Sequence, residues 1–202
     1  MADLPDIAIP ATSLRITCGN IELRLPSPRY AQAQLAATRD DEMIRYLNWN
    51  PQRTIDDALS YINDALTLWQ RGISFLPSIF VIGDDQLIGA TGISGIDRIN
   101  RRGEVGTWIS IPHQGHGHNL QSKAAVCMLG FEILGLHRLE FVVRLDNARS
   151  IASMKQIPCI VDEGVQHARI VDGTGAAHDA RMFAITRASY DASAFPQVSF
   201  TK

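Results

Sequence analysis

The stretch that decides the fold is EVGTWISIPHQGHGHN, residues 104–119, in which a strand-like run enters a loop of glycines and histidines. Beyond it, apolar residues recur every three or four positions from Leu120 to Leu134, which predicts a helix with one buried face. The next run, RLEFVVRL at 138–145, has the composition of a strand. A strand, loop, helix and strand of this length form a right-handed crossover, so we expect the two strands to lie parallel in one sheet.

Three strand-like runs lead up to the helix of this crossover. They cover residues 78–83, 87–94 and 104–111, and a Gly-Asp-Asp-Gln turn of hairpin length joins the first two. Short connections of this kind predict an antiparallel meander. The whole sheet is therefore expected to be mixed and mostly antiparallel.

The N-terminal part of the chain carries one strand signal and three helix signals. Residues 21–25 alternate apolar and polar side chains, as a half-buried strand does. A serine followed by a proline opens a predicted helix at 27–39, and DEMIRYL at 41–47 predicts a second, short one. Thr54, with an acid three positions later, opens a third helix that ends at Gly72. These signals predict an α/β (α+β) protein with helices on both faces of a central sheet.

The composition is that of an ordinary globular protein, with 202 residues, 46% of them hydrophobic and 20% charged. A net charge of −2 gives no excess positive charge for nucleic acid or an anionic membrane, and neither partner is expected. No apolar run approaches about 18 residues, and the first residues do not resemble a secretory signal. Three widely spaced cysteines indicate reduced thiols and a cytoplasmic location. One domain is expected over residues 13–190, with tails at 1–12 and 191–202.

The loop HQGHGHN, residues 113–119, connects a predicted strand to a predicted helix. The first N–H groups of a helix lack partners within it, and the helix dipole favours an anion beside them. Glycines let the backbone approach a phosphate closely, so the loop suits a pyrophosphate. A plain glycine turn is the alternative, because glycine occurs in most tight loops. Nucleotide-binding loops fit poorly, since Gly-Lys-Ser/Thr is missing and position 120 is leucine instead of the third glycine of the dinucleotide motif.

The histidines of the loop, His113, His116 and His118, suggest a second interpretation, because neighbouring histidines can hold zinc. No cysteine or acidic residue lies within the loop to complete such a site. Exposed loop histidines are therefore favoured, and no metal is expected.

The stretch from Gln114 to Gly117 matches the Gln/Arg-x-x-Gly-x-Gly/Ala signature of the GNAT N-acetyltransferases. Two longer segments, 100–119 and 134–157, resemble the RimJ/RimL-type branch of that family, and the resemblance extends over about residues 13–190. It implies the GNAT acyltransferase fold, acetyl-CoA as co-substrate and a primary amine as acceptor, either a protein N-terminus or a small amino compound. It also makes a homodimer the default expectation.

The same resemblance assigns the loop and its surroundings to the acyl donor. The residues that it implies for acetyl-CoA binding are Ile109, Ile111, Gln114, Gly115, His116, Gly117, His118, Asn119, Asn147 and Ser150. Asn119 departs from the pattern, because the family prefers Gly or Ala at that position. The residues implied for the acceptor pocket are Tyr46, Trp49 and Trp108.

Glu104 is the predicted general base. Acetyl transfer to a typical primary amine needs one, because such an amine is protonated at pH 7. Glu104 begins the strand that enters the loop, and in the RimJ/RimL branch an acid there often borders the acceptor site. The alternative is an exposed glutamate that pairs with Arg101 or Arg102.

The resemblance also implies that Ser150 lies near the thioester and donates to the departing sulfur. Ser150 follows Asn147 at the spacing of the branch's Asn-x-x-Ser motif. Small polar residues are common in a first helical turn, so an N-cap role for Asn147 and a local role for Ser150 are the alternatives. No cysteine or serine has a recognisable activating base beside it, so direct attack in a ternary complex is expected and an acyl-enzyme is not.

One departure falls after this last helix, where the family reads Lys-Leu-Gly-Phe and residues 156–159 read Gln-Ile-Pro-Cys. Proline cannot adopt the positive φ that glycine supplies at a helix end, so the helix must end differently. The main prediction is an acetyl-CoA-dependent N-acetyltransferase. This departure and Asn119 leave a second hypothesis open, a protein of the same fold that binds acyl-CoA as a sensor or scaffold and transfers nothing.

Overall fold

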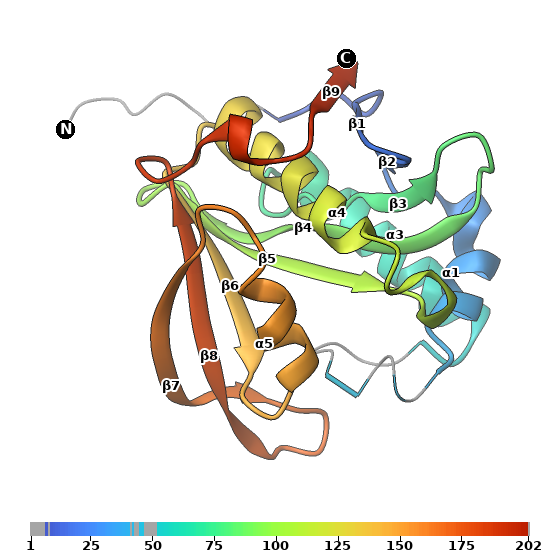
Figure 1. The fold of residues 1–202 in the computed structure, drawn as a ribbon. Coiled ribbons are helices and arrows are strands. Elements are labelled where there is room, and N and C mark those ends of the chain that lie inside the picture. Colours follow the sequence, from blue (N-terminus) through green and yellow to red (C-terminus); the bar gives the residue numbers. More distant parts are fainter. Residues whose placement is uncertain (1–6, 8, 41, 43–44, 47–51, 202) are drawn as a thin grey trace.

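The structure, a computed structural model, describes residues 7, 9–40, 42, 45–46 and 52–201 (Figure 1). The helices are α1 (Ala31–Ala37), α3 (Ile55–Gln70), α4 (His118–Met128), which a π-helical turn (Leu129–Ile133) extends, and α5 (Ala148–Met154). The strands are β1 (Arg15–Cys18), β2 (Ile21–Arg24), β3 (Ser78–Val81), β4 (Leu87–Asp97), β5 (Arg102–Ile109), β6 (Arg138–Arg144), β7 (Val161–Val171), β8 (Ala177–Thr186) and β9 (Val198–Thr201).

These strands form one nine-stranded sheet in the order β7-β8-β6-β5-β4-β3-β2-β1-β9. β5 and β6 run parallel, and the other neighbouring strands that the structure describes pair antiparallel. The parallel pair is the crossover through α4. The prediction of a mixed, mostly antiparallel sheet is therefore confirmed.

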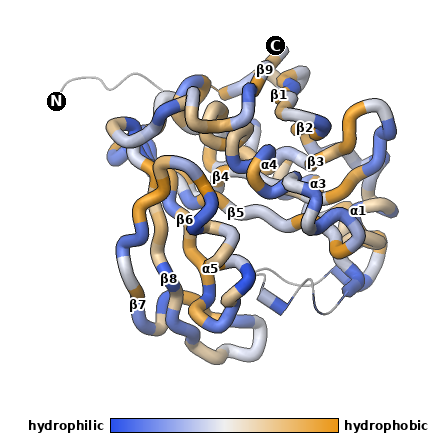
Figure 2. Tube along the Cα trace, in the orientation of Figure 1, coloured by the Kyte–Doolittle hydropathy of each residue, from blue (hydrophilic) through white to orange (hydrophobic). Residues whose placement is uncertain are grey.

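Helices cover both faces of the sheet, as predicted. Successive strand residues face opposite sides, so Ile109 joins the main core cluster with Val126 of α4, while its neighbour Trp108 joins a separate cluster that contacts α1. α3 packs on α1 behind this second face. Hydrophobic residues concentrate along the central strands, and the outer turns are mostly hydrophilic (Figure 2).

α3 begins with the capping arrangement that the sequence predicts. The Thr54 hydroxyl accepts a hydrogen bond from the N–H of Asp57, and the Asp57 carboxylate accepts one from the N–H of Thr54. Ile62 and Trp69 are buried on the inner face of the helix. Gly72, with φ of 63°, follows the helix and turns the chain towards β3.

β5 and β6 start side by side and then separate (Figure 1). They pair only at residues 102–104 against 138–140, so residues 105–109 of β5 have no partner on β6. α4 borders this opening in the sheet, and α5 follows β6 directly along the chain. The gap between the two parallel strands is the feature that positions the site.

Segments near both chain ends, which the sequence analysis assigns to tails, contribute to the fold. Val198–Thr201 forms β9, which pairs with β1, and Phe195 is buried. Near the other end Ile7 is buried, and the carbonyl of Pro10 accepts a hydrogen bond of 3.0 Å from the indole of Trp69. The prediction of a C-terminal tail is therefore wrong. A four-residue edge strand has too short a pattern to be recognised in the sequence.

The end of α5 accommodates the departure from the family pattern. The helix ends at Met154, and Ile157 packs into the core. Because Pro158 cannot adopt a left-handed conformation, Cys159 adopts it one residue later, with φ of 60°. A non-glycine residue in that conformation costs roughly 1–2 kcal/mol.

The predicted helix at 41–47 lies largely outside the described residues, and Trp49 lies outside them altogether. Of the helices that the structure does describe, none is long and apolar enough to span a membrane.

Candidate active site

A cavity of about 570 Å³ opens where β5 and β6 separate. Its walls come from β5, β6, α4, α5 and the glycine loop before α4. The predicted site residues that line it are Tyr46, Glu104, Trp108, Ile109, Gln114, Gly115, Gly117, His118, Asn119, Asn147 and Ser150. Residues chosen from distant parts of the sequence thus come together at one opening in the sheet.

Two residues predicted to bind the acyl donor, Ile111 and His116, do not belong to this lining, and both are exposed. The glycine signature specifies a backbone path. It does not separate side chains that face a ligand from those that point away.

The loop takes the conformation that its glycines allow. Gly115 and Gly117 both have φ of 81°, and Gly117 is the N-cap of α4. Within the described backbone, the N–H groups of residues 115–119 have no hydrogen-bond partner. A Cβ at either glycine would meet no protein atom within 4 Å. Free N–H groups beside open space at a helix N-terminus are suited to phosphate oxygens.

Side-chain hydrogen bonds connect the loop to β5 and α5. Gln114 donates to the carbonyl of Ile109 and accepts from Arg149, each at 2.7 Å. Asn119 donates to the hydroxyl of Ser153, also at 2.7 Å. The Asn119 side chain, which departs from the family pattern, therefore links α4 to α5 across the cavity wall. Arg149 adds a cation close to the free N–H groups.

The three loop histidines have different surroundings. Nδ1 of His113 lies 2.9 Å from the hydroxyl of Ser110, and burial is the main cause of a lowered pKa for His113. His118 is buried, with Nδ1 3.0 Å from the carbonyl oxygen of His113 and Nε2 3.4 Å from the side-chain amide of Asn20. The exposed His116 ring stacks on His118. Among the described residues, no group of His, Cys, Asp or Glu side chains is placed to hold a metal ion.

Glu104 lies at the end of the β5–β6 pairing, opposite Glu140 of β6. It is half-buried at the cavity wall and forms an ion pair of 3.3 Å with Arg169 of β7. Burial raises the pKa of Glu104 above its ordinary value, Glu140 raises it further, and Arg169 opposes both. The alternative was an exposed strand-end glutamate paired with Arg101 or Arg102. Glu104 is instead half-buried, and its ion pair is with Arg169.

Asn147 is the N-cap of α5, and its side-chain oxygen accepts a hydrogen bond of 3.0 Å from the N–H of Ser150. The capping alternative therefore holds for Asn147. The bond uses the backbone of Ser150 and not its hydroxyl, and both residues line the cavity.

Tyr46 and Trp108 are the predicted acceptor residues that the structure describes. The Arg144 guanidinium lies 5.5 Å from the centroid of the Tyr46 ring. Trp108 is 6% exposed and packs in the cluster with Phe80 and Leu87, so it serves the core as well as the cavity.

Lys123 is a cavity residue that sequence reasoning missed. It is 3% exposed, its Nζ donates to the hydroxyl of Thr107, and burial lowers its pKa to about 8. A signal was present in the sequence. Lys123 stands three residues after Leu120 and four before Cys127, on the apolar face of α4, where a charge is unusual.

Residues 20–157 match the family described as the acetyltransferase (GNAT) domain. The chain is 32% identical over 130 residues to the uncharacterized N-acetyltransferase YoaA of Bacillus subtilis (strain 168), covering 63% of this chain and 72% of YoaA. It is 31% identical over 106 residues to the ribosomal-protein-serine acetyltransferase of Escherichia coli (strain K12), covering 52% of this chain and 58% of that enzyme. The solved structure of the microcin C7 self immunity acetyltransferase MccE, in complex with acetyl-CoA and AMP, superposes with a TM-score of 0.73 at 20% identity, covering 83% and 92% of the two chains.

The chain therefore belongs to the GNAT acetyltransferase family. Its relatives include a ribosomal-protein-serine acetyltransferase, and the resemblance to the GNAT N-acetyltransferases drawn from the loop and its flanks is confirmed. The likeness to MccE, at 20% identity, establishes the fold alone.

Proposed function

We propose that this protein is an acetyl-CoA-dependent N-acetyltransferase that moves an acetyl group to a primary amine in a ternary complex. The observation that carries the proposal is the cavity between β5 and β6, bounded by the unpartnered N–H groups of the loop and by Glu104. These two features are what the donor's phosphates and the acceptor's amine require.

The donor's pyrophosphate fits the loop. The N–H groups of residues 115–119 are free to donate, and the helix dipole of α4 favours negative charge there. No acidic side chain stands in the first turn of α4, and Arg149 adds positive charge. From this end, the acyl arm would follow the unpaired part of β5 into the cavity.

Glu104 is the proposed base for the acceptor. A carboxylate whose pKa is raised by burial takes a proton more readily than an exposed one. The neutral amine forms a bond to the carbonyl carbon, the carbon–sulfur bond breaks, and Glu104 takes the proton from nitrogen directly or through water. Ser150 supplies the hydrogen bond that the departing sulfur accepts.

The proposed route has no acyl-enzyme. Burial raises the pKa of Cys127 to about 12 and that of Cys18 to about 11, so neither thiol ionises near neutral pH. Neither cysteine belongs to the cavity lining. Intact protein mass after incubation with acetyl-CoA alone is expected to be unchanged, and a stoichiometric gain of one acetyl group would contradict this route.

The acceptor is a protein N-terminus or a small amino compound. The E. coli relative acts on a ribosomal protein serine, which favours peptides that begin with serine. In this chain the acceptor would enter beside Tyr46 and Trp108, on the sheet face that Glu104 shares with Trp108.

The test is thiol release from acetyl-CoA across peptides with free N-termini, amino acids and aminoglycosides, run for the wild type and Glu104→Gln. We expect the wild type to release thiol with one class of amine. In Glu104→Gln the rate of release should fall by about 100-fold, because the general base is lost. Silence with every amine, in a protein whose melting temperature CoA raises, would favour the non-catalytic acyl-CoA-binding alternative.

A further inference from the structure

Lys123 is a buried cation that the proposed reaction does not yet use. The chain has three lysines, at positions 123, 155 and 202. Lys155 is exposed, whereas Lys123 is 3% exposed. No ion pair joins Lys123 to a carboxylate in the described part of the chain, and its hydrogen-bond partner is the neutral hydroxyl of Thr107. An unpaired buried charge lowers the stability of the folded protein, so we look for a function of this charge at the cavity wall.

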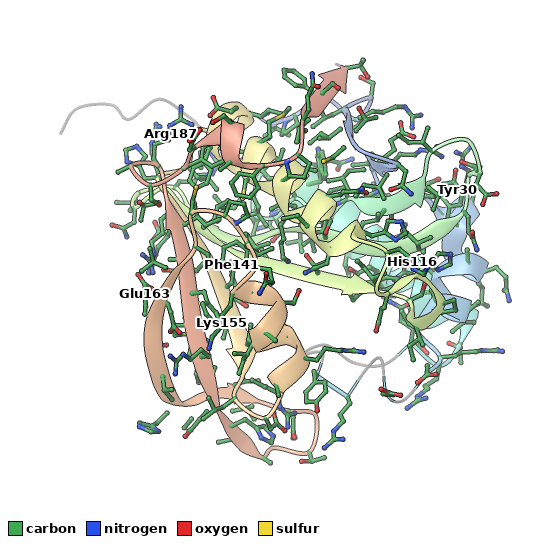
Figure 3. All side chains as sticks on the ribbon, in the orientation of Figure 1. Tyr30, His116, Phe141, Lys155, Glu163 and Arg187 are labelled. Carbon is green, nitrogen blue, oxygen red and sulfur yellow. The ribbon has the colours of Figure 1, made fainter. Side chains whose placement is uncertain are left out.

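The side chain of Lys123 spans the inner end of the gap between the two strands. On one side it donates to Thr107, in the middle of the β5 segment that has no partner on β6. On the other side its Nζ lies 5.6 Å from the ring centroid of Phe141, the first β6 residue after the pairing ends. Phe141, labelled in Figure 3, lies on β6 between α4 and α5 in that view. A ligand that fills the gap therefore ends against this ammonium.

The position along α4 separates Lys123 from the loop. Lys123 follows Gly117, the N-cap of the helix, by six residues, which is about 9 Å along the helix axis. Phosphates held by the loop would lie at one end of this distance and the ammonium at the other. An ammonium has three N–H groups that can donate hydrogen bonds, and the structure shows one of them donating to the hydroxyl of Thr107.

We propose that Lys123 is a further catalytic residue, whose ammonium donates a hydrogen bond to the carbonyl oxygen of the bound thioester and stabilises the negative charge that forms there. This inference rests on the proposed acetyl transfer. When the acceptor nitrogen bonds to the carbonyl carbon, the π electron pair moves to oxygen. When the carbon–sulfur bond breaks, that pair reforms the double bond and sulfur leaves with the bonding pair. Lys123 keeps its proton throughout.

The charge on Lys123 limits the pH range of this role. Burial lowers its pKa to about 8, so the ammonium predominates at pH 7 and is lost above pH 8. Cys127, one turn further along α4, stays a neutral thiol because burial raises its pKa to about 12. The other ionisable groups that line the cavity are Glu104 of β5, His113 of the loop, His118 of α4, Arg144 of β6, Arg149 of α5 and Tyr46.

Lys123→Met is the first test, because methionine matches the length of the lysine stem and removes the charge. We expect kcat to fall by about 100-fold, as for loss of an oxyanion donor, and the fall of kcat above pH 8 to disappear. The affinity for CoA, which has no thioester carbonyl, should change less than threefold. The melting temperature at pH 7 should rise, because a buried unpaired charge is removed, and a purely structural lysine would lower it.

Lys155→Met is the matched control, an exposed lysine at the C-cap of α5, the helix beside the cavity. It should leave kcat, its pH profile and the melting temperature unchanged. A Lys123→Met enzyme with kcat within threefold of the wild type and the same fall above pH 8 would overturn the proposal.

Binding by the unaltered protein gives a second test, which needs neither turnover nor a folded variant. A thioether analogue of acetyl-CoA, with a methylene in place of the carbonyl, cannot accept the hydrogen bond from Lys123. Calorimetry at pH 7 should show acetyl-CoA binding at least threefold more tightly than the analogue, and the preference should vanish at pH 9.5. Equal affinities at pH 7 would overturn the proposal.

The two proposals fail in different ways. If the wild type binds acetyl-CoA and releases no thiol with any amine, the proposed function fails, while the thioether comparison still reports on Lys123. If the wild type transfers acetyl groups and Lys123→Met does so equally well, only the inference about Lys123 fails.

Discussion

Two neighbours of Glu104, the proposed general base, shift its pKa in opposite directions. Its register partner Glu140 raises the pKa of Glu104, and Arg169 lowers it. The carboxylate is the active form of a base, so kcat/KM should rise with pH through the pKa of Glu104. Glu140→Gln should move this rise to lower pH, and Arg169→Met should move it to higher pH.

These two substitutions separate a base from a structural glutamate. Neither Glu140 nor Arg169 lines the cavity, so both variants should keep a kcat within a few-fold of the wild type at the pH optimum. Initial rates at subsaturating amine between pH 5 and pH 8 give the measurement. A rise that stays at one pH in all three proteins would mean that another group titrates.

Stability at alkaline pH should report the buried charge of Lys123. Its pKa is lowered from 10.5 to about 8 in the folded chain, so between these values the unfolded chain binds a proton that the folded chain has released. The free energy of unfolding of the wild type should therefore rise relative to Lys123→Met across this window, by about 1.4 kcal/mol per pH unit. Urea unfolding of both proteins at pH 7, 8, 9 and 10 measures the difference, and a constant difference would show that Lys123 titrates normally.

At the scale of elements, the loop that opens α4 depends on two left-handed glycines. Gly117→Ala places a Cβ in open space beside the free N–H groups. Gly175, far along the chain in the β7–β8 hairpin, has a similar φ of 86°, so Gly175→Ala is the control. Both should lose roughly 1–2 kcal/mol of stability from backbone strain. Only Gly117→Ala should weaken acetyl-CoA binding, by about tenfold, which corresponds to about 1.4 kcal/mol.

Calorimetric titration with acetyl-CoA compares the two variants at a temperature where both are folded. Equal affinities would mean that the cavity beside Gly117 does not hold the phosphates. Reduced affinity in both would point to a global effect of lost stability.

The same element shows what the sequence could predict. Glycine spacing at a strand-to-helix junction implies a backbone path, and Gly115 and Gly117 have the predicted conformation. The helix behind the loop was predicted at 120–134, and the structure has α4 and its π-helical turn over 118–133. Side-chain directions within the loop could not be predicted. His116 and His118 flank the same glycine, yet His116 is exposed and His118 is buried.

Lys123 and Arg169 show the limit of the sequence for the site. Lys123 interrupts an apolar face, but a pattern of spacings does not say that the face borders a cavity. Arg169 reaches Glu104 across 65 positions of sequence, through strand pairing that no local signal encodes. Packing in three dimensions decides both cases.

At the scale of the whole molecule, the sheet separates the site from its edges. Among the described residues β9 pairs only with β1, at one edge, and the cavity lies between β5 and β6. Deleting residues 198–202 should therefore lower the melting temperature by roughly 2–4 °C for each kcal/mol lost. The value of kcat at 25 °C should stay within twofold of the full chain. Thermal melts and thiol-release rates measure both, and a large loss of kcat would mean that the edge strand supports the site.

The mixed sheet itself was predictable, because short turns and one long crossover dictate which strands run parallel. β9 was not, because its four residues have no flanking turn pattern and depend on β1, which lies about 180 positions earlier. The gap between β5 and β6 was not predictable either. It follows from the register, which ends at Glu104 and Glu140 although both strands continue.

The most direct test of acetyl transfer at this gap is one assay, thiol release from acetyl-CoA, for the wild type, Glu104→Gln and Gly117→Ala with the best amine. We predict a lower kcat with an unchanged KM for acetyl-CoA in Glu104→Gln, and a higher KM for acetyl-CoA with a retained kcat in Gly117→Ala. If the wild type binds CoA and releases no thiol with any amine tested, the protein does not transfer acetyl groups to these acceptors, and the central claim is contradicted.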